Sequence, residues 1–91
     1  MKKNILVAGC GHWGKNLVRN FAAIGALKYI SDPNKKLAQS MADQYQIEHI
    51  PYDQAIKSNE VEGVVIAAPA QFHAEMSISA MKLGKHVYVE K

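Results

Sequence analysis

The sequence has few of the features that mark several common protein classes. Its 91 residues include one cysteine, so neither an intramolecular disulfide nor a paired-thiol motif is available, which is typical of a reducing compartment. Its apolar runs are far shorter than the roughly 18 residues that cross a bilayer. The sequence shows no repeat, linker or low-complexity stretch. We therefore expect one soluble, cytoplasmic domain without a membrane segment.

A strong charge of one sign is also missing. Eleven Lys and Arg accompany eight Asp and Glu, for a net charge of +3. Basic residues are adjacent only at Lys2-Lys3 and Lys35-Lys36. A nucleic-acid-binding domain would gather them on one face and interleave aromatic residues, so we expect no nucleic-acid partner. We also expect no metal site, because metal-ligand spacing is absent among His12, His49, His73 and His86.

The stretch NILVAGCGHWG, residues 4–14, allows two interpretations. LVAGC after the basic start resembles a lipoprotein cleavage site, but an export signal needs an apolar segment of about 7–15 residues. Only six residues separate Lys3 from Cys10, and one of them is the polar Asn4. We interpret the stretch as a buried strand that leads into a glycine-rich turn.

Apolar spacing alternates between strand and helix patterns along the whole chain. Strands are predicted at residues 4–8, 27–31, 48–50, 63–68 and 86–89. Helices are predicted from Trp13 to a stop at Gly25, after Asp32-Pro33 with an apolar face from Leu37 to Tyr45, at 52–58, and at 72–83. The last helix aligns Phe72, Met76, Ala80 and Leu83. Short connections of this kind predict an α/β fold, a Rossmann-type doubly wound parallel sheet of about five strands in the order 3-2-1-4-5.

Ligands of such sheets bind beyond the carboxyl ends of the strands, where the strand order reverses. Here the order reverses between the first and fourth strands. The candidate site therefore comprises the loops that follow Ala8, Ser31, Ala68 and Val89.

The loop after the first strand contains a complete G-x-G-x-x-G pattern. In a dinucleotide site Gly9 permits the tight turn, Gly11 lets a pyrophosphate approach the backbone, and Gly14 lets the helix pack on the strand. The unpaired N–H groups of the helix N-terminus then face the phosphates. His12 and Trp13 are candidate cofactor contacts, and Trp13 also fits the apolar face of its helix.

Two further residues near this loop have alternative roles. Cys10 has no neighbouring thiol, which favours a small packed side chain over a redox sensor. Asp32 follows Gly9 by 23 positions, close to the roughly 20 at which an acid binds the ribose 2′-hydroxyl. The alternative for Asp32 is the N-cap of the next helix, which Pro33 supports. A carboxylate there favours NAD over NADP, although Lys35 and Lys36 could reach a phosphate.

The segments GCGHWGKNLVRNF, SDPN, AAPAQFHAE and AMKLGKHVYVEK together resemble the nucleotide-binding half of the Gfo/Idh/MocA oxidoreductases. The resemblance covers essentially the whole chain, and WGKNLVRNF is most similar to the bacterial branch acting on sugar nucleotides and their N-acetylated uronic acids. It implies hydride transfer between nicotinamide and a sugar, sugar-nucleotide or cyclitol hydroxyl. A methyltransferase with a similar glycine-rich turn fits the later segments poorly.

The resemblance also implies roles for individual residues. The family's Pro and downstream His in the fourth-strand loop are matched by Pro69 and His73, and its Glu-Lys-Pro motif by Glu90 and Lys91. The family's lysine helps to move the proton, which assigns that role to Lys91, and its glutamate helps to position the cofactor. Ala68 departs from the family pattern, because members often have Thr there.

The chain stops before the motif's proline and before a substrate domain. We therefore expect residues 1–91 to be the N-terminal dinucleotide-binding domain of a longer two-domain enzyme, inactive alone. The alternative is a stand-alone nucleotide-binding or sensor module. An uncovered fifth strand further predicts association through that edge, or marginal stability.

Overall fold

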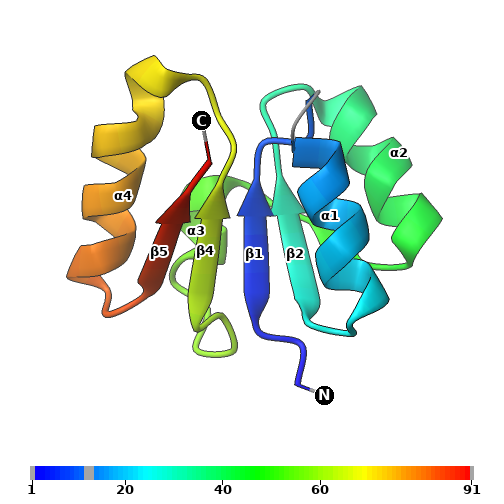
Figure 1. Cartoon of the computed structure of the whole chain (residues 1–91), viewed down its shortest axis with the longest axis horizontal. Helices are drawn as coiled ribbons and strands as arrows, with labels where there is room; N and C mark the ends of the chain where they lie inside the picture. The colour runs from blue at the N-terminus through cyan, green and yellow to red at the C-terminus, as the bar shows by residue number, and fades with distance from the viewer. Residues whose placement is uncertain (1, 12–13, 91) are drawn as a thin grey trace.

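The computed structural model describes residues 2–11 and 14–90. Their backbone forms a five-stranded sheet in the order β3-β2-β1-β4-β5, with every neighbouring pair parallel. Figure 1 shows the arrows of the labelled strands pointing to the same edge. The predicted strand order and the α/β class are confirmed. The strands are β1 (Ile5–Ala8), β2 (Leu27–Ser31), β3 (Glu48–His49), β4 (Gly63–Ile66) and β5 (His86–Val89).

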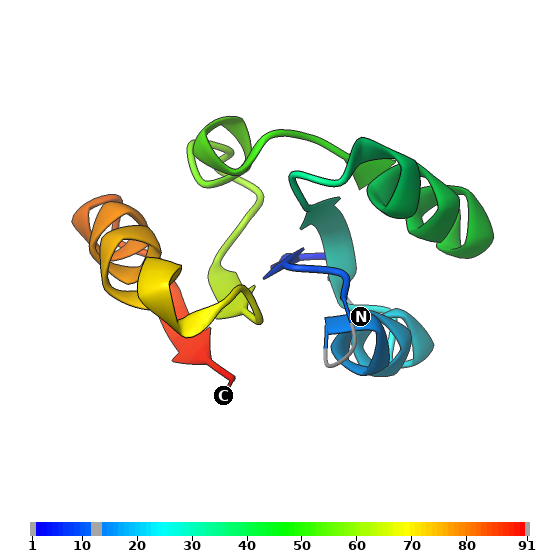
Figure 2. The ribbon, with the colours of Figure 1, turned by 90° about the horizontal axis from the view of Figure 1, so that it is seen from above.

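Helices cover both faces of this sheet. Figure 2, seen from above, shows α1 and α2 on one side and α3 and α4 on the other. This arrangement is the doubly wound one, because the crossovers change faces where the chain passes from β3 to β4. The helices are α1 (Gly14–Ala23), α2 (Lys35–Tyr45), α3 (Tyr52–Ala55) and α4 (His73–Lys82), and a 3₁₀ turn, η1 (Ala70–Phe72), precedes α4.

The sheet separates two hydrophobic cores. Successive strand residues point to opposite faces, so Val7 packs in the core beneath α1 and α2 whereas Leu6 packs in the core beneath α3 and α4. The predicted apolar face of the helix from Leu37 to Tyr45 is confirmed, and apolar residues of α1 and α2 face this first core. Partly buried side chains from them pack against the first core, namely Leu17, Phe21, Ala22, Leu37, Met41 and Tyr45.

The beginning of α2 differs from the expectation. Asn34, not Asp32, is the N-cap, and its side-chain oxygen accepts a hydrogen bond from Leu37 N at 3.0 Å. Pro33 lies before the helix. The physical reason is that both carboxylate oxygens of Asp32 bind other backbone amides, so an N-cap role for Asp32 is wrong.

The ends of α4 also differ from the expectation. Met76 packs against the second core and Ala80 is buried in it, as predicted. Phe72 and Leu83, however, are 45% and 47% exposed. Phe72 belongs to the 3₁₀ turn and Leu83 is the C-cap, so helical spacing does not carry them onto the inner face.

The remaining predicted elements are present with shorter bounds. β3, α3 and β4 end before residues 50, 58 and 68, respectively. A search of residues 2–11 and 14–90 found no helix long and apolar enough to cross a membrane.

Candidate functional site

The loop after β1 lies at the edge of the sheet where the strands end (Figure 1). Gly9 has φ +106°, a conformation that residues with a Cβ rarely adopt. A Cβ there would also lie 2.8 Å from the carbonyl carbon of Ala67. Gly9 N donates to Ser31 O at 2.7 Å. The first glycine therefore lets the loop turn while it packs against the loop after β4.

The other two glycines of the pattern have different surroundings. A Cβ on Gly14 would lie 1.8 Å from the carbonyl oxygen of Gly9, so only glycine lets α1 begin this close to the turn. A Cβ on Gly11 would meet none of the described residues within 4 Å. The described residues therefore leave space beside Gly11, and a glycine at this position of the pattern is the one that lets a pyrophosphate approach the backbone in dinucleotide sites.

Asp32 connects the loop after β1 to the loop after β2. Its Oδ2 accepts a hydrogen bond from Cys10 N at 2.7 Å, and its Oδ1 accepts one from Asn34 N at 2.8 Å. An ionised carboxylate has about four lone-pair sites. Asp32 can therefore hold both loops in place and still accept hydrogen bonds from a ligand.

Cys10 is a packed residue of this loop. Its side chain is 1% exposed and belongs to the core beneath α1 and α2. Burial, followed by the nearby Asp32 carboxylate, raises the pKa of the Cys10 thiol to about 12. The expectation of a small packed side chain is confirmed, and a thiol held protonated in this way is poorly suited to redox sensing.

The loop after β4 approaches the glycine-rich loop. Ala67 N donates to Ala8 O at 2.7 Å, and Phe72 N donates to Pro69 O at 2.9 Å. Pro69 is exposed, whereas His73 is partly buried. His73 Nε2 lies 2.6 Å from Ala68 O. Pro69 and His73 thus belong to one ordered turn at the carboxyl edge.

The end of β5 brings Glu90 to the same edge. Glu90 N donates to Ile66 O at 2.8 Å, and the Tyr88 hydroxyl donates to Glu90 Oε2 at 3.2 Å. The hydrogen bond to Glu90 is the main cause of the raised pKa of Tyr88. Glu90 is therefore partly buried beside the end of β4, with its carboxylate held by an exposed tyrosine.

The structure gathers the described site candidates at one edge. Seven candidates lie in or beside the loops that follow β1, β2, β4 and β5, namely Gly9, Gly11, Gly14, Asp32, Pro69, His73 and Glu90. His12, Trp13 and Lys91 lie outside the described residues. Sequence reasoning missed two contributors, the Cys10 amide and the Tyr88 hydroxyl. An alternate-residue pattern in β5 could have indicated the second, because Tyr88 and Glu90 share one face of the strand.

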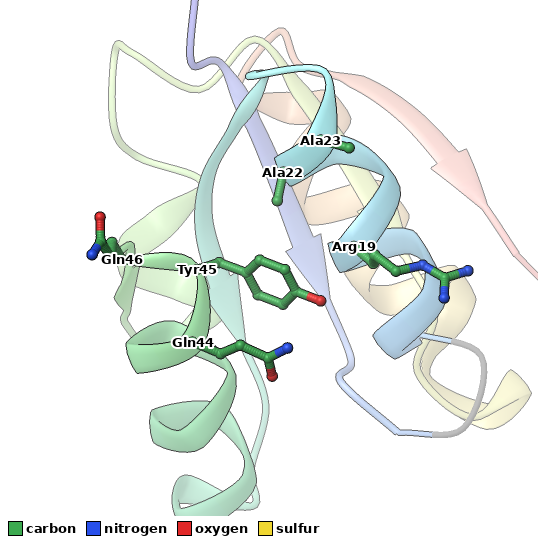
Figure 3. Close-up of a pocket in the computed structure, with 6 residues that line it drawn as sticks. All are labelled: Arg19, Ala22, Ala23, Gln44, Tyr45 and Gln46. Carbon is green, nitrogen blue, oxygen red and sulfur yellow. The ribbon is translucent and has the colours of Figure 1, made fainter.

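A shallow hollow of about 350 Å³ lies elsewhere, between the later turns of α1 and the end of α2. Figure 3 shows the Tyr45 ring directed toward α1, and the Arg19 side chain extending from α1 away from that ring. None of the described residues of the glycine-rich loop lines this hollow. Within residues 2–11 and 14–90, no three His, Cys, Asp or Glu side chains gather to hold a metal.

The fold and the glycine-rich loop beside Asp32 define a Rossmann-type dinucleotide-binding domain. Residues 3–91 match the Gfo/Idh/MocA oxidoreductase family, described as an oxidoreductase family with an NAD-binding Rossmann fold. The chain belongs to this family, and NAD is the cofactor of the domain that it matches.

Similar proteins include enzymes with several substrates. The chain is 32% identical over 90 residues to 4-carboxy-2-hydroxymuconate-6-semialdehyde dehydrogenase of Sphingobium sp., a match covering 94% of this chain and 29% of that protein. The structure of UDP-N-acetylglucosamine 3-dehydrogenase from Acidithiobacillus ferrooxidans matches with a TM-score of 0.90 and 29% identity, over 100% of this chain and 30% of that chain.

A third similar protein was solved with ligands. WlbA dehydrogenase from Bordetella pertussis, in complex with NADH and UDP-GlcNAcA, matches with a TM-score of 0.88 and 25% identity, over 100% of this chain and 29% of that chain. The present chain therefore spans about three tenths of the length of each of these three proteins.

Proposed function

We propose that residues 1–91 are the cofactor-binding domain of a two-domain oxidoreductase that transfers hydride between NAD and a sugar, sugar-nucleotide or cyclitol hydroxyl. The observation that carries the proposal is the glycine-rich turn between β1 and α1, joined to Asp32 through the Cys10 amide. The second domain is supported by the greater length of the relatives. A sugar-nucleotide substrate is supported by two of the similar structures.

The residues at the carboxyl edge fit a dinucleotide. The open backbone at Gly11 and the first N–H groups of α1 suit a pyrophosphate, and Asp32 retains acceptor capacity for the ribose hydroxyls. His12 and Trp13 extend the same loop as further proposed contacts. When bound, the nicotinamide supplies the hydride chemistry.

The reacting half of the site is assigned to the loops after β4 and β5. Pro69 and His73 shape the first of these loops, and Glu90 positions the cofactor at the second. Lys91 moves the proton of the substrate hydroxyl, because a lysine that is partly desolvated beside bound cofactor has its pKa lowered toward a useful range. The assignment of Lys91 rests on the family resemblance.

The preference for NAD over NADP follows from Asp32. A carboxylate at the ribose repels a 2′-phosphate, whereas the exposed Lys35 and Lys36 in the first turn of α2 reduce that repulsion. We propose NAD as the cofactor, with NADP binding more weakly.

The proposal also covers the setting of the protein. A cytoplasmic location is supported by the single free thiol at Cys10. The proposed ligands are a dinucleotide and a sugar-type substrate, and we propose no nucleic-acid ligand. The proposed protein partner is a second copy of the chain, bound at the β5 edge.

A cofactor titration tests the proposal. NADH and NADPH are titrated into the wild type and Asp32→Ala, with quenching of the only tryptophan as the signal. We expect saturable binding of NADH, weaker binding of NADPH, and a smaller difference between them in the variant. Because Asp32 also holds the Cys10 and Asn34 amides, the ratio of the two affinities is the informative quantity. Absence of NADH binding to the wild type contradicts the proposal.

The alternative, a nucleotide-binding module without catalysis, needs a separate test. In that case Glu90 and Lys91 are only a charged chain end, and Lys91→Ala leaves NADH affinity unchanged. A measurable loss of affinity in Lys91→Ala favours the oxidoreductase instead.

A further inference from the structure

His73 is engaged with the backbone of its own loop. It is the first residue of α4 and is partly buried, and its Nε2 lies 2.6 Å from the carbonyl oxygen of Ala68. A carbonyl oxygen only accepts hydrogen bonds, so Nε2 carries the proton and donates. This ring nitrogen is therefore already committed within the chain.

The hydrogen bond to the Ala68 carbonyl is one of a few that order this loop. Pro69, the next residue, has no backbone N–H and so cannot donate a bond of its own. Ala67 N is bound to Ala8 O, and Phe72 N is bound to Pro69 O. The hydrogen bond from His73 joins the end of this loop to its beginning at Ala68. Residues 67–73 are therefore fixed by three hydrogen bonds.

The position of this loop relates it to one half of the cofactor. Asp32 and the glycine-rich loop provide for the adenine ribose and the pyrophosphate. A dinucleotide that crosses the carboxyl edge from β2 through β1 reaches β4 with its other half. Residues 67–73 therefore border the nicotinamide half.

We propose that His73 is a positioning residue for the nicotinamide half of the cofactor, acting through its hydrogen bond to the Ala68 carbonyl. It sets the shape of the loop at residues 67–73 and does not use Nε2 on the ligand. This inference rests on the proposed function, because it assumes that the carboxyl edge binds NAD.

A pair of amide substitutions separates this role from general support of the fold. Glutamine places its side-chain nitrogen about where histidine has Nε2, whereas asparagine places its nitrogen near Nδ1, too short to reach Ala68 O. NADH and ADP-ribose, which lacks the nicotinamide, are titrated calorimetrically into the wild type, His73→Asn and His73→Gln. His86→Asn is the matched control, because His86 is exposed in β5.

We expect His73→Asn to weaken NADH binding about fivefold to tenfold, the effect of losing one ordinary hydrogen bond. ADP-ribose should bind within about twofold of wild type by the same reasoning, and His73→Gln should restore NADH affinity. Equal losses for NADH and ADP-ribose, or unchanged NADH binding in His73→Asn, overturn the inference. A wild type that binds neither ligand overturns the proposed function, and the inference with it.

Imidazole nitrogen NMR gives an independent readout on the ligand-free chain. At a pH where the ring is neutral, we expect His73 to carry its proton on Nε2. A proton on Nδ1 contradicts the inference even if His73→Asn fails to fold.

Discussion

Asp32 shows how one side chain can order two loops of the proposed site. Its two oxygens receive the amides of Cys10 and Asn34, which belong to different loops of the carboxyl edge. Each such charge-assisted bond stabilises more than a neutral one. The loop is therefore shaped before ligand binds, which reduces the ordering cost of association.

The Cys10 thiol predicts how stability depends on pH. Folding raises its pKa from 9.0 to about 12. The folded state therefore retains a proton that the unfolded chain releases, and this contribution to stability is complete below pH 9 and is lost as pH rises toward 12. Burial also raises the pKa of Tyr52 from 10.0 to about 12. Its contribution to stability is likewise lost at high pH, beginning above about pH 10.

We expect the free energy of unfolding to fall more steeply with pH in the wild type than in Cys10→Ala. Between pH 8 and about 10.5 the wild type should lose about 2 kcal/mol more of its free energy of unfolding than the variant, by proton linkage. Urea denaturation at a series of pH values measures it. Parallel curves for the two proteins would show that Cys10 does not titrate in this way.

The residue scale also shows what sequence could specify. The roles of Gly9 and Gly14 followed from the strand–turn–helix context, because they depend on backbone geometry that is local in sequence. The choice between Asp32 and Asn34 as N-cap did not, because it depends on the Cys10 amide, which lies 22 residues away. Roles of His12, Trp13 and Lys91 remain predictions.

At the scale of elements, Lys85 joins the beginning of β5 to the loop before β4. Its Nζ donates to Ser58 O at 2.8 Å and to Val61 O at 2.6 Å. The side chain is only partly exposed. One lysine thus ties together two connections at the edge opposite the cofactor loops.

We expect Lys85→Met to lower the free energy of unfolding by about 1–2 kcal/mol, because it leaves carbonyl oxygens without a charged donor. Methionine retains most of the apolar stem. Lys57→Met is the control, since Lys57 is exposed, and it should change stability by less than about 0.5 kcal/mol. Chemical denaturation compares the three proteins, and equal stabilities would rule out this role for Lys85.

Element boundaries were predictable where the apolar pattern was regular. β2 and β5 have their predicted bounds, because Gly25 and Asp32-Pro33 flank the first run and Gly84 precedes the second. Phe72 and Leu83 were misplaced on the inner face, since helical spacing in the sequence continues through a 3₁₀ turn and a C-cap without any visible break. Strand order followed from the connections alone.

At the scale of the whole molecule, β5 is, with β3, one of the two edge strands of the described sheet. It pairs only with β4 among the described strands. Tyr88 and Val89 on it are 58% and 39% exposed. Unpaired strand edges with apolar side chains favour pairing with another chain.

We expect the 91-residue chain to associate through β5 as its concentration rises, as measured by light scattering. Val89→Lys should weaken the association, because a charged edge opposes strand pairing. Ile24→Lys is the matched control, since Ile24 is 54% exposed but lies after α1, and it should associate as the wild type does. A wild type that stays monomeric with a high Tm contradicts this expectation.

The place of β1 in the sheet bears on how the protein forms during synthesis. Of the five described strands, β1 is made first and is also the central one, and it pairs with β2 on one side and with β4 on the other. The residues of β2 follow those of β1 directly, so this partner of β1 is made before β4. Pairing between Ile5 and Gly63 requires the second half of the chain. The residues of the loops proposed for the pyrophosphate and the adenine ribose are thus made before those of the loops proposed to border the nicotinamide.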